Sequence, residues 1–285
     1  MMSKIKFQPA VKWSGSKRSQ VNDILTYIPD KIGTYYEPFC GGCSVLYGML
    51  CSGKQVGNYV CSDLNGDLIG LWNEIKNNPK EVCDYYCKLW NEMNCNDLDV
   101  SEKRKYFETV RERYNKERNP LDFMFIMRTT TNGMPRYNSN GEFNNSFHIT
   151  RNGIIPDKLN KIIYEWSELL RKNNVNFECC SYENIKPSIE DYLYLDPPYA
   201  CTTGMYFGVF DNKKFFNWLR NINCGWVLSY DGIKGEIDST YDVPNDIYDE
   251  HVYIKSGNSS FKRVIGKDKH AIVYESLYIK NEQSN

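Results

Sequence analysis

An acid, two prolines and a tyrosine follow a short apolar run in the segment YLYLDPPYA, residues 192–200. The run predicts a buried strand, which places Asp196 at its carboxyl end, where ligands bind to open α/β sheets. Pro197 and Pro198 have no N–H and a fixed φ, so they leave carbonyl oxygens without a competing donor. Asp196 and the carbonyl of Pro197 then form a pair of acceptors suited to a planar amino group.

Tyr199 adds an aromatic face to this pair of acceptors. Stacking a base on such a ring contributes on the order of 1–3 kcal/mol. The tetrapeptide therefore predicts a site that binds and orients an exocyclic amine. The alternative is a strand that ends in a proline turn, with Tyr199 as a packing residue. The order of residue types in the tetrapeptide is specific enough to favour the functional interpretation.

Two further segments predict a nucleoside site. In YYEPFCGGCSVLY, residues 35–47, Gly41 and Gly42 make a tight turn before a helix and let the backbone approach a ligand. In VCSDLNGDLI, residues 60–69, Asp63 ends the next strand, where an acid can bind ribose hydroxyls. Each segment alone also fits an ordinary strand, turn and capped helix. Without a G-x-G-x-x-G run, an adenosyl group with a small charged tail fits better than a dinucleotide.

Alternating strands and helices must position these segments. Strand patterns occupy residues 34–39, 58–63, 175–180, 191–196, 225–231, 247–254 and 270–279. Helical periodicity occupies residues 18–28, 44–52, 65–77, 158–172 and 212–222. The alternation predicts an α/β fold, with a mostly parallel sheet and helices on both faces. The last two strands have no helix between them, which predicts an antiparallel hairpin at one edge.

The middle of the chain has a different composition. Residues 78–127 carry helical patterns rich in charge, and residues 128–153 are dense in Asn, Gly, Ser and Thr. The latter composition predicts ordered loop or a short hairpin around Asn140 and Gly141. Residues 78–152 are therefore predicted to be an insertion between two halves of an α/β domain.

Composition narrows the classes of function. The chain of 285 residues has a net charge of −1, no membrane-length apolar run and no signal peptide, so we expect an intracellular protein. Its 11 cysteines include a C-x-x-C at Cys40 and Cys43, but no second pair with suitable spacing, so we predict no metal site. Basic residues gather in 1–18, 101–118 and 251–270. If the three segments lie on one face of the protein, they form a basic surface that can bind a polyanion. If they do not, they are solvated faces.

Five segments occur in the order AVKWSGSK, EPFCGGCS, SDLN, NGMPRYNSNGEFN and LDPPY. Together they resemble the DNA adenine-N6 methyltransferases of the Dam type, the α group of the D12 class, phage members included. The resemblance extends from Lys12 to about Tyr274. It implies a Rossmann-like methyltransferase sheet with an inserted helical and loop domain. Residues 1–77 and 153–285 would bind S-adenosylmethionine and catalyse the reaction, and residues 78–152 would recognise double-stranded DNA.

The resemblance also implies roles for individual residues. The cofactor set, which would contact S-adenosylmethionine, comprises Trp13, Ser14, Gly15, Lys17, Phe39, Gly41, Asp63, Leu64, Ser181, Tyr182 and Asp196. The DNA set comprises Lys12, Arg111, Arg113, Arg128, Asn132, Met134, Arg136 and Asn138. Arg136 would read guanine and Met134 would contact a thymine methyl group. Lys12 would reach a base, Asn132 would lie near the flipped adenine, and the three remaining arginines would bind phosphates.

The catalytic residues that the resemblance implies are Asp196, Pro197, Pro198 and Tyr199. They would hold an adenine swung out of the duplex for direct in-line methyl transfer, which depends on positioning more than on a strong base or a metal. The Asp of DPPY fits adenine better than cytosine N4. The alternatives are a methyltransferase that acts on cytosine N4 or on RNA, and an inactive DNA-binding module of this fold.

Two departures from the family pattern concern the recognition sequence. Thr131 stands where members that read GATC carry an aromatic residue, and residues 144–153 lack the usual PFG ending, so GATC is not assigned. We expect the protein in the cytoplasm of a bacterial or phage-infected cell, without a membrane or an obligatory protein partner. Whether the protein has a cognate restriction enzyme stays open.

Overall fold

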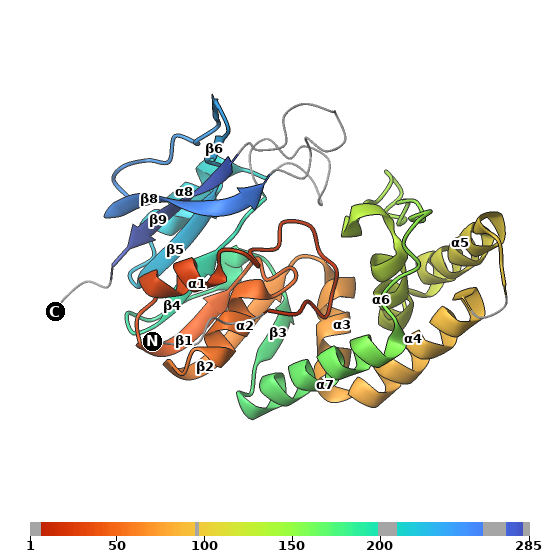
Figure 1. Ribbon diagram of the computed structural model, residues 1–285. Helices are drawn as coiled ribbons and strands as arrows, with labels where there is room; N and C mark the ends of the chain where they lie inside the picture. Colours follow the sequence, from red (N-terminus) through yellow and green to blue (C-terminus); the bar gives the residue numbers. More distant parts are fainter. Residues whose placement is uncertain (1–6, 95–96, 199–209, 259–271, 282–285) are drawn as a thin grey trace.

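The fold is built on a sheet whose central strands are parallel (Figure 1). The computed structural model describes residues 7–94, 97–198, 210–258 and 272–281. The parallel strands lie in the order β3-β2-β1-β4-β5, with bounds β1 Lys31–Glu37, β2 Gln55–Asp63, β3 Asn176–Cys179, β4 Tyr192–Leu195 and β5 Gly225–Tyr230. Antiparallel strands extend the β5 edge, with bounds β6 Ile233–Lys234, β7 Ile237–Asp238, β8 Glu250–Asn258 and β9 Ile272–Lys280. The predicted mostly parallel sheet with an antiparallel edge hairpin is confirmed.

Hydrophobic clusters cover both faces of the sheet. In β4, Tyr192 and Tyr194 pack into one cluster, and Leu193 and Leu195 into the other. A strand buried on both faces has no polar alternation, which explains its continuous apolar run. The first cluster includes residues of α1 (Val21–Ile24), α2 (Ser44–Cys51), α3 (Gly66–Asn77) and α7 (Pro156–Lys172), and the second those of α8 (Asn212–Arg220). Within the described ranges, no helix is both long and apolar enough to cross a membrane.

Three helices lie between α3 and α7 in the chain and pack beside them (Figure 1). They are α4 (Pro79–Asn94), α5 (Val100–Glu117) and α6 (Pro120–Thr129). Asp99 and Glu102 form a capping box at the start of α5, and Asn119 caps α6. The hydrophobic core continues from α3 and α7 into these helices. The division of the chain at residues 78 and 152 therefore stays a prediction.

The direction of strand addition reverses between β1 and β4. From β1 the chain adds β2 and β3 on one side, whereas β4 and β5 lie on the other. The carboxyl ends of β1 and β4 therefore meet at a switch point, where open α/β sheets bind ligands. Glu37 ends β1, Asp63 ends β2, and Asp196 directly follows β4. The topology thus brings the three predicted segments to one edge of the sheet.

Candidate functional site

A cavity of about 490 Å³ opens at this edge, at the carboxyl ends of β1, β2 and β4. Every member of the cofactor set lines it, together with Pro197 and Pro198. Tyr199 lies outside the described residues. No member of the DNA set lines it. Further lining residues that the sequence did not single out include Glu37, Asn65, Tyr137, Phe210 and Lys214.

Backbone N–H groups hold the carboxylate of Asp63. Its Oδ2 accepts from the N–H of Gly41 at 3.2 Å, and its Oδ1 from that of Asn65 at 3.0 Å. Burial raises the pKa of Asp63 to about 6, and these hydrogen bonds offset part of the effect. The neighbouring residue, Leu64, is 58% exposed and presents apolar surface to a ligand. An acceptor for hydroxyls and an apolar face therefore lie side by side.

Gly41 allows the turn after β1 to pack closely against Trp13. Its φ is +46°, and an added Cβ would lie 2.9 Å from the indole ring of Trp13. Its carbonyl accepts a hydrogen bond from Nε1 of the buried Trp72 at 2.9 Å. Cys43, two residues later, also has a positive φ, 54°, at the N-cap of α2. Gly41 and Cys43 thus both have a left-handed backbone conformation in this turn.

Aromatic rings form another part of the cavity wall. The ring of Phe39 lies 5.6 Å from that of Tyr182 and 5.8 Å from that of Phe210. Tyr182 begins the short helix η3 (Tyr182–Asn184), whose N-cap Ser181 accepts from the N–H of Glu183 at 3.3 Å. These rings provide a surface on which a planar or apolar ligand can pack.

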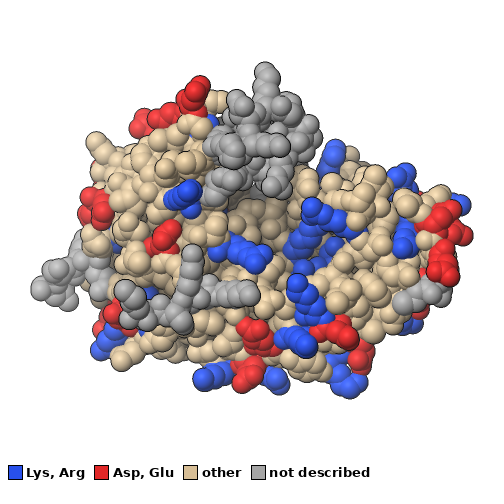
Figure 2. All heavy atoms as spheres, in the orientation of Figure 1, with Lys and Arg blue, Asp and Glu red and all other residues tan. Residues whose placement is uncertain are grey.

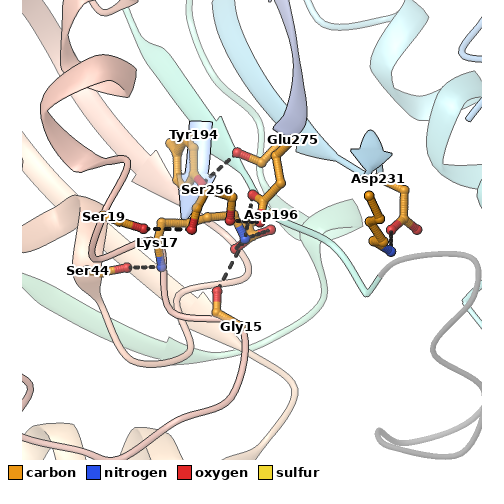
Figure 3. Close-up of polar contacts among 11 residues, drawn as sticks. Gly15, Lys17, Ser19, Ser44, Tyr194, Asp196, Asp231, Ser256 and Glu275 are labelled. Carbon is orange, nitrogen blue, oxygen red and sulfur yellow. Dashed lines mark hydrogen bonds and ion pairs between the residues drawn. The ribbon is translucent and has the colours of Figure 1, made fainter. Parts of the chain in front are cut away.

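A charged cluster lies at the end of β4 (Figure 3). Nζ of Lys17 donates to Asp196 Oδ1 at 2.7 Å and Oδ2 at 2.6 Å, and to the carbonyl of Gly15 at 3.2 Å. The same Nζ lies 3.7 Å from Oε2 of Glu275. The backbone N–H of Lys17 donates to Oγ of Ser44 at 3.0 Å, which joins this segment to the start of α2. Only 4% of the Lys17 side chain is exposed, so the ion pair is largely shielded from water.

Glu37 and Glu275 are the acids near this cluster that sequence reasoning missed. Burial raises the pKa of Glu37 to about 8, although the hydroxyl of Tyr35 donates a hydrogen bond to its carboxylate at 2.7 Å, which lowers the pKa. The carboxyl of Glu37 therefore carries a proton at neutral pH. Its place in EPF, at a strand end, is a signal that could have identified it. Glu275 lies inside β9, a strand that pairs with both β5 and β8, where no local pattern marks it.

Half of the DNA set lies in the segment after α6. Arg136 and Asn132 are exposed, and Met134 is partly buried. Asn138 belongs to the turn of a short hairpin, where its Oδ1 accepts from the backbone N–H groups of residues 140 and 142 at 3.0 and 2.9 Å. An antiparallel bridge between residues 137 and 143 closes this hairpin, as expected around Asn140 and Gly141.

Lys12 joins the N-terminal segment to the same region. Its Nζ donates to the carbonyl of Thr130 at 2.8 Å. Burial, followed by the charges of Arg151 and Arg128, lowers the pKa of Lys12 to about 8. This lysine therefore lies among other cations, an arrangement that an anionic ligand would stabilise.

Arg128 and Arg111, two of the predicted phosphate contacts, donate hydrogen bonds to backbone carbonyls of the chain itself. The guanidinium of Arg128 donates to the carbonyl oxygens of Pro9 and Ala10, and burial lowers its pKa to about 10. Arg128 thus ties α6 to the N-terminal segment, and its contact with a phosphate stays a prediction. Arg111 is partly buried, and its Nη1 donates to the carbonyl of Asn145 at 3.3 Å.

Arg113 forms a bidentate pair with Asp122. Its Nε lies 2.8 Å from Oδ2, and its Nη2 2.5 Å from Oδ1. The Asp122 side chain is fully buried, and the hydroxyl of Tyr85 also donates to it at 2.9 Å. The pairing favours a structural role for Arg113 over the predicted phosphate contact.

The substitution Arg113→Ala is expected to lower the free energy of unfolding by about 3 kcal/mol, because it leaves a buried carboxylate without its charge partner. Urea unfolding followed by circular dichroism measures the change. Arg104→Ala, at an exposed position of the same helix, is the control and should change it by less than about 0.5 kcal/mol. If the two variants lower the free energy of unfolding equally, Arg113 has no structural role of this kind and is again a candidate for binding a phosphate.

The surface in Figure 2 shows Lys and Arg side chains around a hollow between the sheet and helices α4 to α6. Basic side chains that line a hollow attract polyanions and accelerate their association. Of the three basic segments predicted from the sequence, residues 1–6 of the first and 259–270 of the third lie outside the described ranges.

The comparisons with known proteins agree on one family. A family model described as D12 class N6 adenine-specific DNA methyltransferase matches residues 13–219. The type II methyltransferase M.MjaIII of Methanocaldococcus jannaschii is 30% identical over 206 residues, 67% of this chain and 69% of that protein. The type II methyltransferase M.CviBI of Paramecium bursaria Chlorella virus NC1A is 30% identical over 286 residues, 96% of this chain and 99% of that protein. The DNA adenine methylase of Escherichia coli K12 is 31% identical over 197 residues, 67% of this chain and 64% of that protein. The resemblance seen in the sequence is confirmed: this chain belongs to the D12 class of N6 adenine-specific DNA methyltransferases.

Proposed function

We propose that the chain transfers the methyl group of S-adenosylmethionine to N6 of an adenine swung out of double-stranded DNA. The observation that carries the proposal is the cavity that unites the cofactor set, Asp196 included, with the two prolines that follow Asp196. Asp196 is 19% exposed and lies where a strand of the parallel sheet ends, so a ligand in the cavity can reach it. Family membership supports the same reaction.

The lining residues fit this methyl donor. The Asp63 carboxylate can accept from ribose hydroxyls, and Leu64 and Phe39 can pack on an adenine ring. When bound, S-adenosylmethionine supplies a methyl group on a sulfonium: the N6–CH₃ bond forms as the S–CH₃ bond breaks, the bonding electron pair goes to sulfur, and a proton leaves N6.

The chain contributes orientation to this transfer. The Asp196 carboxylate and the carbonyl of Pro197 accept the two N6 hydrogens, which aims the nitrogen lone pair at the methyl group. Pro198 keeps the backbone extended and donates no competing hydrogen bond. An adenine inside a duplex cannot reach this edge of the sheet, so the base has to be extruded.

The segment of residues 130–138 is our candidate for base recognition. The exposed Arg136 can pair in a bidentate manner with guanine O6 and N7, and Met134 can contact a thymine methyl group. This segment touches the cofactor cavity, since the N–H of Ser14 donates to the carbonyl of Gly133 at 3.2 Å. Base recognition and cofactor binding therefore take place on neighbouring parts of the chain.

Incubation with S-adenosylmethionine and unmethylated genomic DNA, followed by single-molecule sequencing, tests the proposal. We expect N6-methyladenine within one short sequence, which also identifies the recognition site. N4-methylcytosine, methylation of RNA alone, or no methylation of any nucleic acid would each refute it.

The affinity for S-adenosylmethionine is expected to rise with pH through about 6 and then level off. The raised pKa of Asp63 means that its carboxyl is mostly protonated below that pH and then accepts hydroxyl hydrogen bonds poorly. If only the ionised form binds, the apparent Kd at pH 5 is about tenfold higher than at pH 7.5. Titration calorimetry across this range measures it. Asp63→Asn should bind weakly with a flat profile, and parallel profiles for the two proteins would contradict the assignment.

A further inference from the structure

The hairpin of β8 and β9 brings a carboxylate to the catalytic cluster (Figure 3). Glu275 lies on β9 opposite Ile254, with Oε2 3.7 Å from Nζ of Lys17. Its other oxygen, Oε1, accepts from Oγ of Ser256 at 2.9 Å. The side chain is only 16% exposed. This strand lies beyond residues 13–219, the part of the chain that the family model matches.

Close backbone packing sets the position of Glu275. Gly232, just after β5, approaches β9 so closely that an added Cβ would lie 3.0 Å from the Cα of Glu275. The hairpin is also tied to the N-terminal segment, since Oγ of Ser19 donates to the carbonyl of Ser256 at 3.1 Å. The carboxylate is therefore held beside Lys17 by contacts on two sides.

The ion pair between Lys17 and Asp196 competes with the proposed binding of adenine. Both oxygens of Asp196 accept from Nζ of Lys17, and the amino group of the target base needs one of them as its acceptor. Moving a buried ammonium away from a carboxylate partner would cost several kcal/mol if no other carboxylate took its place. A second carboxylate at 3.7 Å reduces this cost, because the ammonium can move towards it and stay paired.

We propose that Glu275 is a positioning residue that takes up Lys17 when the adenine amino group binds to Asp196. The inference rests on the proposed function, because it concerns the adenine that Asp196 receives. Without the charge of Glu275, Lys17 stays on Asp196 and opposes the base. The loss falls on the methyl-transfer step rather than on cofactor binding.

Single-turnover methyl transfer to a DNA duplex that contains the mapped site tests this role. Glu275→Gln is expected to slow transfer about tenfold, with the Kd for S-adenosylmethionine within twofold of wild type, and Glu275→Asp should recover part of the rate. Glu250→Gln, the same change at an exposed position of β8, is the control and should transfer at the wild-type rate. Equal rates for the two Gln variants would overturn the inference while the proposed function stands.

A double-mutant cycle separates this role from a structural one. In a Lys17→Met background, Glu275→Gln should change the rate less than twofold, because its effect passes through the lysine. A tenfold loss in both backgrounds, or a lowered unfolding midpoint that accounts for the loss, would show that Glu275 acts without Lys17. If the wild-type protein transfers no methyl group to DNA, the proposed function fails, and this inference fails with it.

Discussion

Replacing Asp196 with alanine is expected to slow methyl transfer at least about a thousandfold, while the Kd for S-adenosylmethionine changes little. The substitution removes the carboxylate acceptor and leaves only the carbonyl of Pro197 to orient the amino group, and the N6 lone pair, delocalised into the purine ring, attacks poorly unless it is aimed. A thousandfold loss corresponds to about 4 kcal/mol of transition-state stabilisation. Single-turnover transfer of a radiolabelled methyl group measures the rate, and titration calorimetry measures cofactor binding.

Asp242→Ala, at an exposed position, is the control for this substitution and should leave both quantities unchanged. Lys17 keeps Glu275 as a carboxylate neighbour in the alanine variant, so the charged cluster should tolerate the change. A variant that transfers methyl groups at a rate within tenfold of wild type would exclude Asp196 as the group that orients the base. Loss of cofactor binding and activity together would assign the residue to the cofactor instead.

Much of the fold could be predicted because its signals are local. A parallel strand buried on both faces is apolar throughout, as in Tyr192–Leu195, and amphipathic helices such as α7 repeat apolar residues every three or four positions. Helix ends were less certain: the helix predicted over residues 18–28 is an α-helix only at Val21–Ile24, followed by a short 3₁₀ helix, Leu25–Tyr27. The order of the strands has no such signal, since it depends on pairing between distant segments.

The residues of the cavity could be predicted for a related reason. Asp63 is the last residue of its strand, and Gly41 and Asp196 closely follow the ends of theirs; parallel strands bring their carboxyl ends to the same edge. A local pattern, the strand end followed by a glycine or an acid, therefore carries information about a shared site. Their roles in binding and catalysis stay predictions that the variants above test.

Contacts between distant segments could not be predicted in this way. Arg113 and Arg128 are of the residue type that often binds phosphate. In the structure, Arg113 pairs with the buried Asp122, and Arg128 donates to backbone carbonyls. The same limit applies to Glu275, whose neighbour Lys17 lies at the other end of the chain. A charged residue shows its partner only once the chain has folded, because no spacing along the sequence encodes the pair.

Gly41→Val is expected to raise the Kd for S-adenosylmethionine on the order of a hundredfold or more, or about 2.7 kcal/mol. A β-branched residue is strained at a φ of +46°, and its Cβ would collide with the ring of Trp13 at 2.9 Å. The ring has to move, and both residues line the cavity. The N–H of Gly41 also donates to Asp63, so the displaced turn disturbs the acceptor proposed for the ribose.

Gly53→Val separates backbone strain from this collision. Gly53 also has a positive φ, +76°, but an added Cβ there meets no atom within 4 Å, and the residue does not line the cavity. This control should lose stability to a similar backbone strain and bind S-adenosylmethionine as wild type does. Titration calorimetry at a temperature where both variants are folded compares the two. If they bind equally well, the closeness of Gly41 to Trp13 has no part in holding the methyl donor, and the cavity has to accept its ligand through the aromatic wall and Asp63 alone.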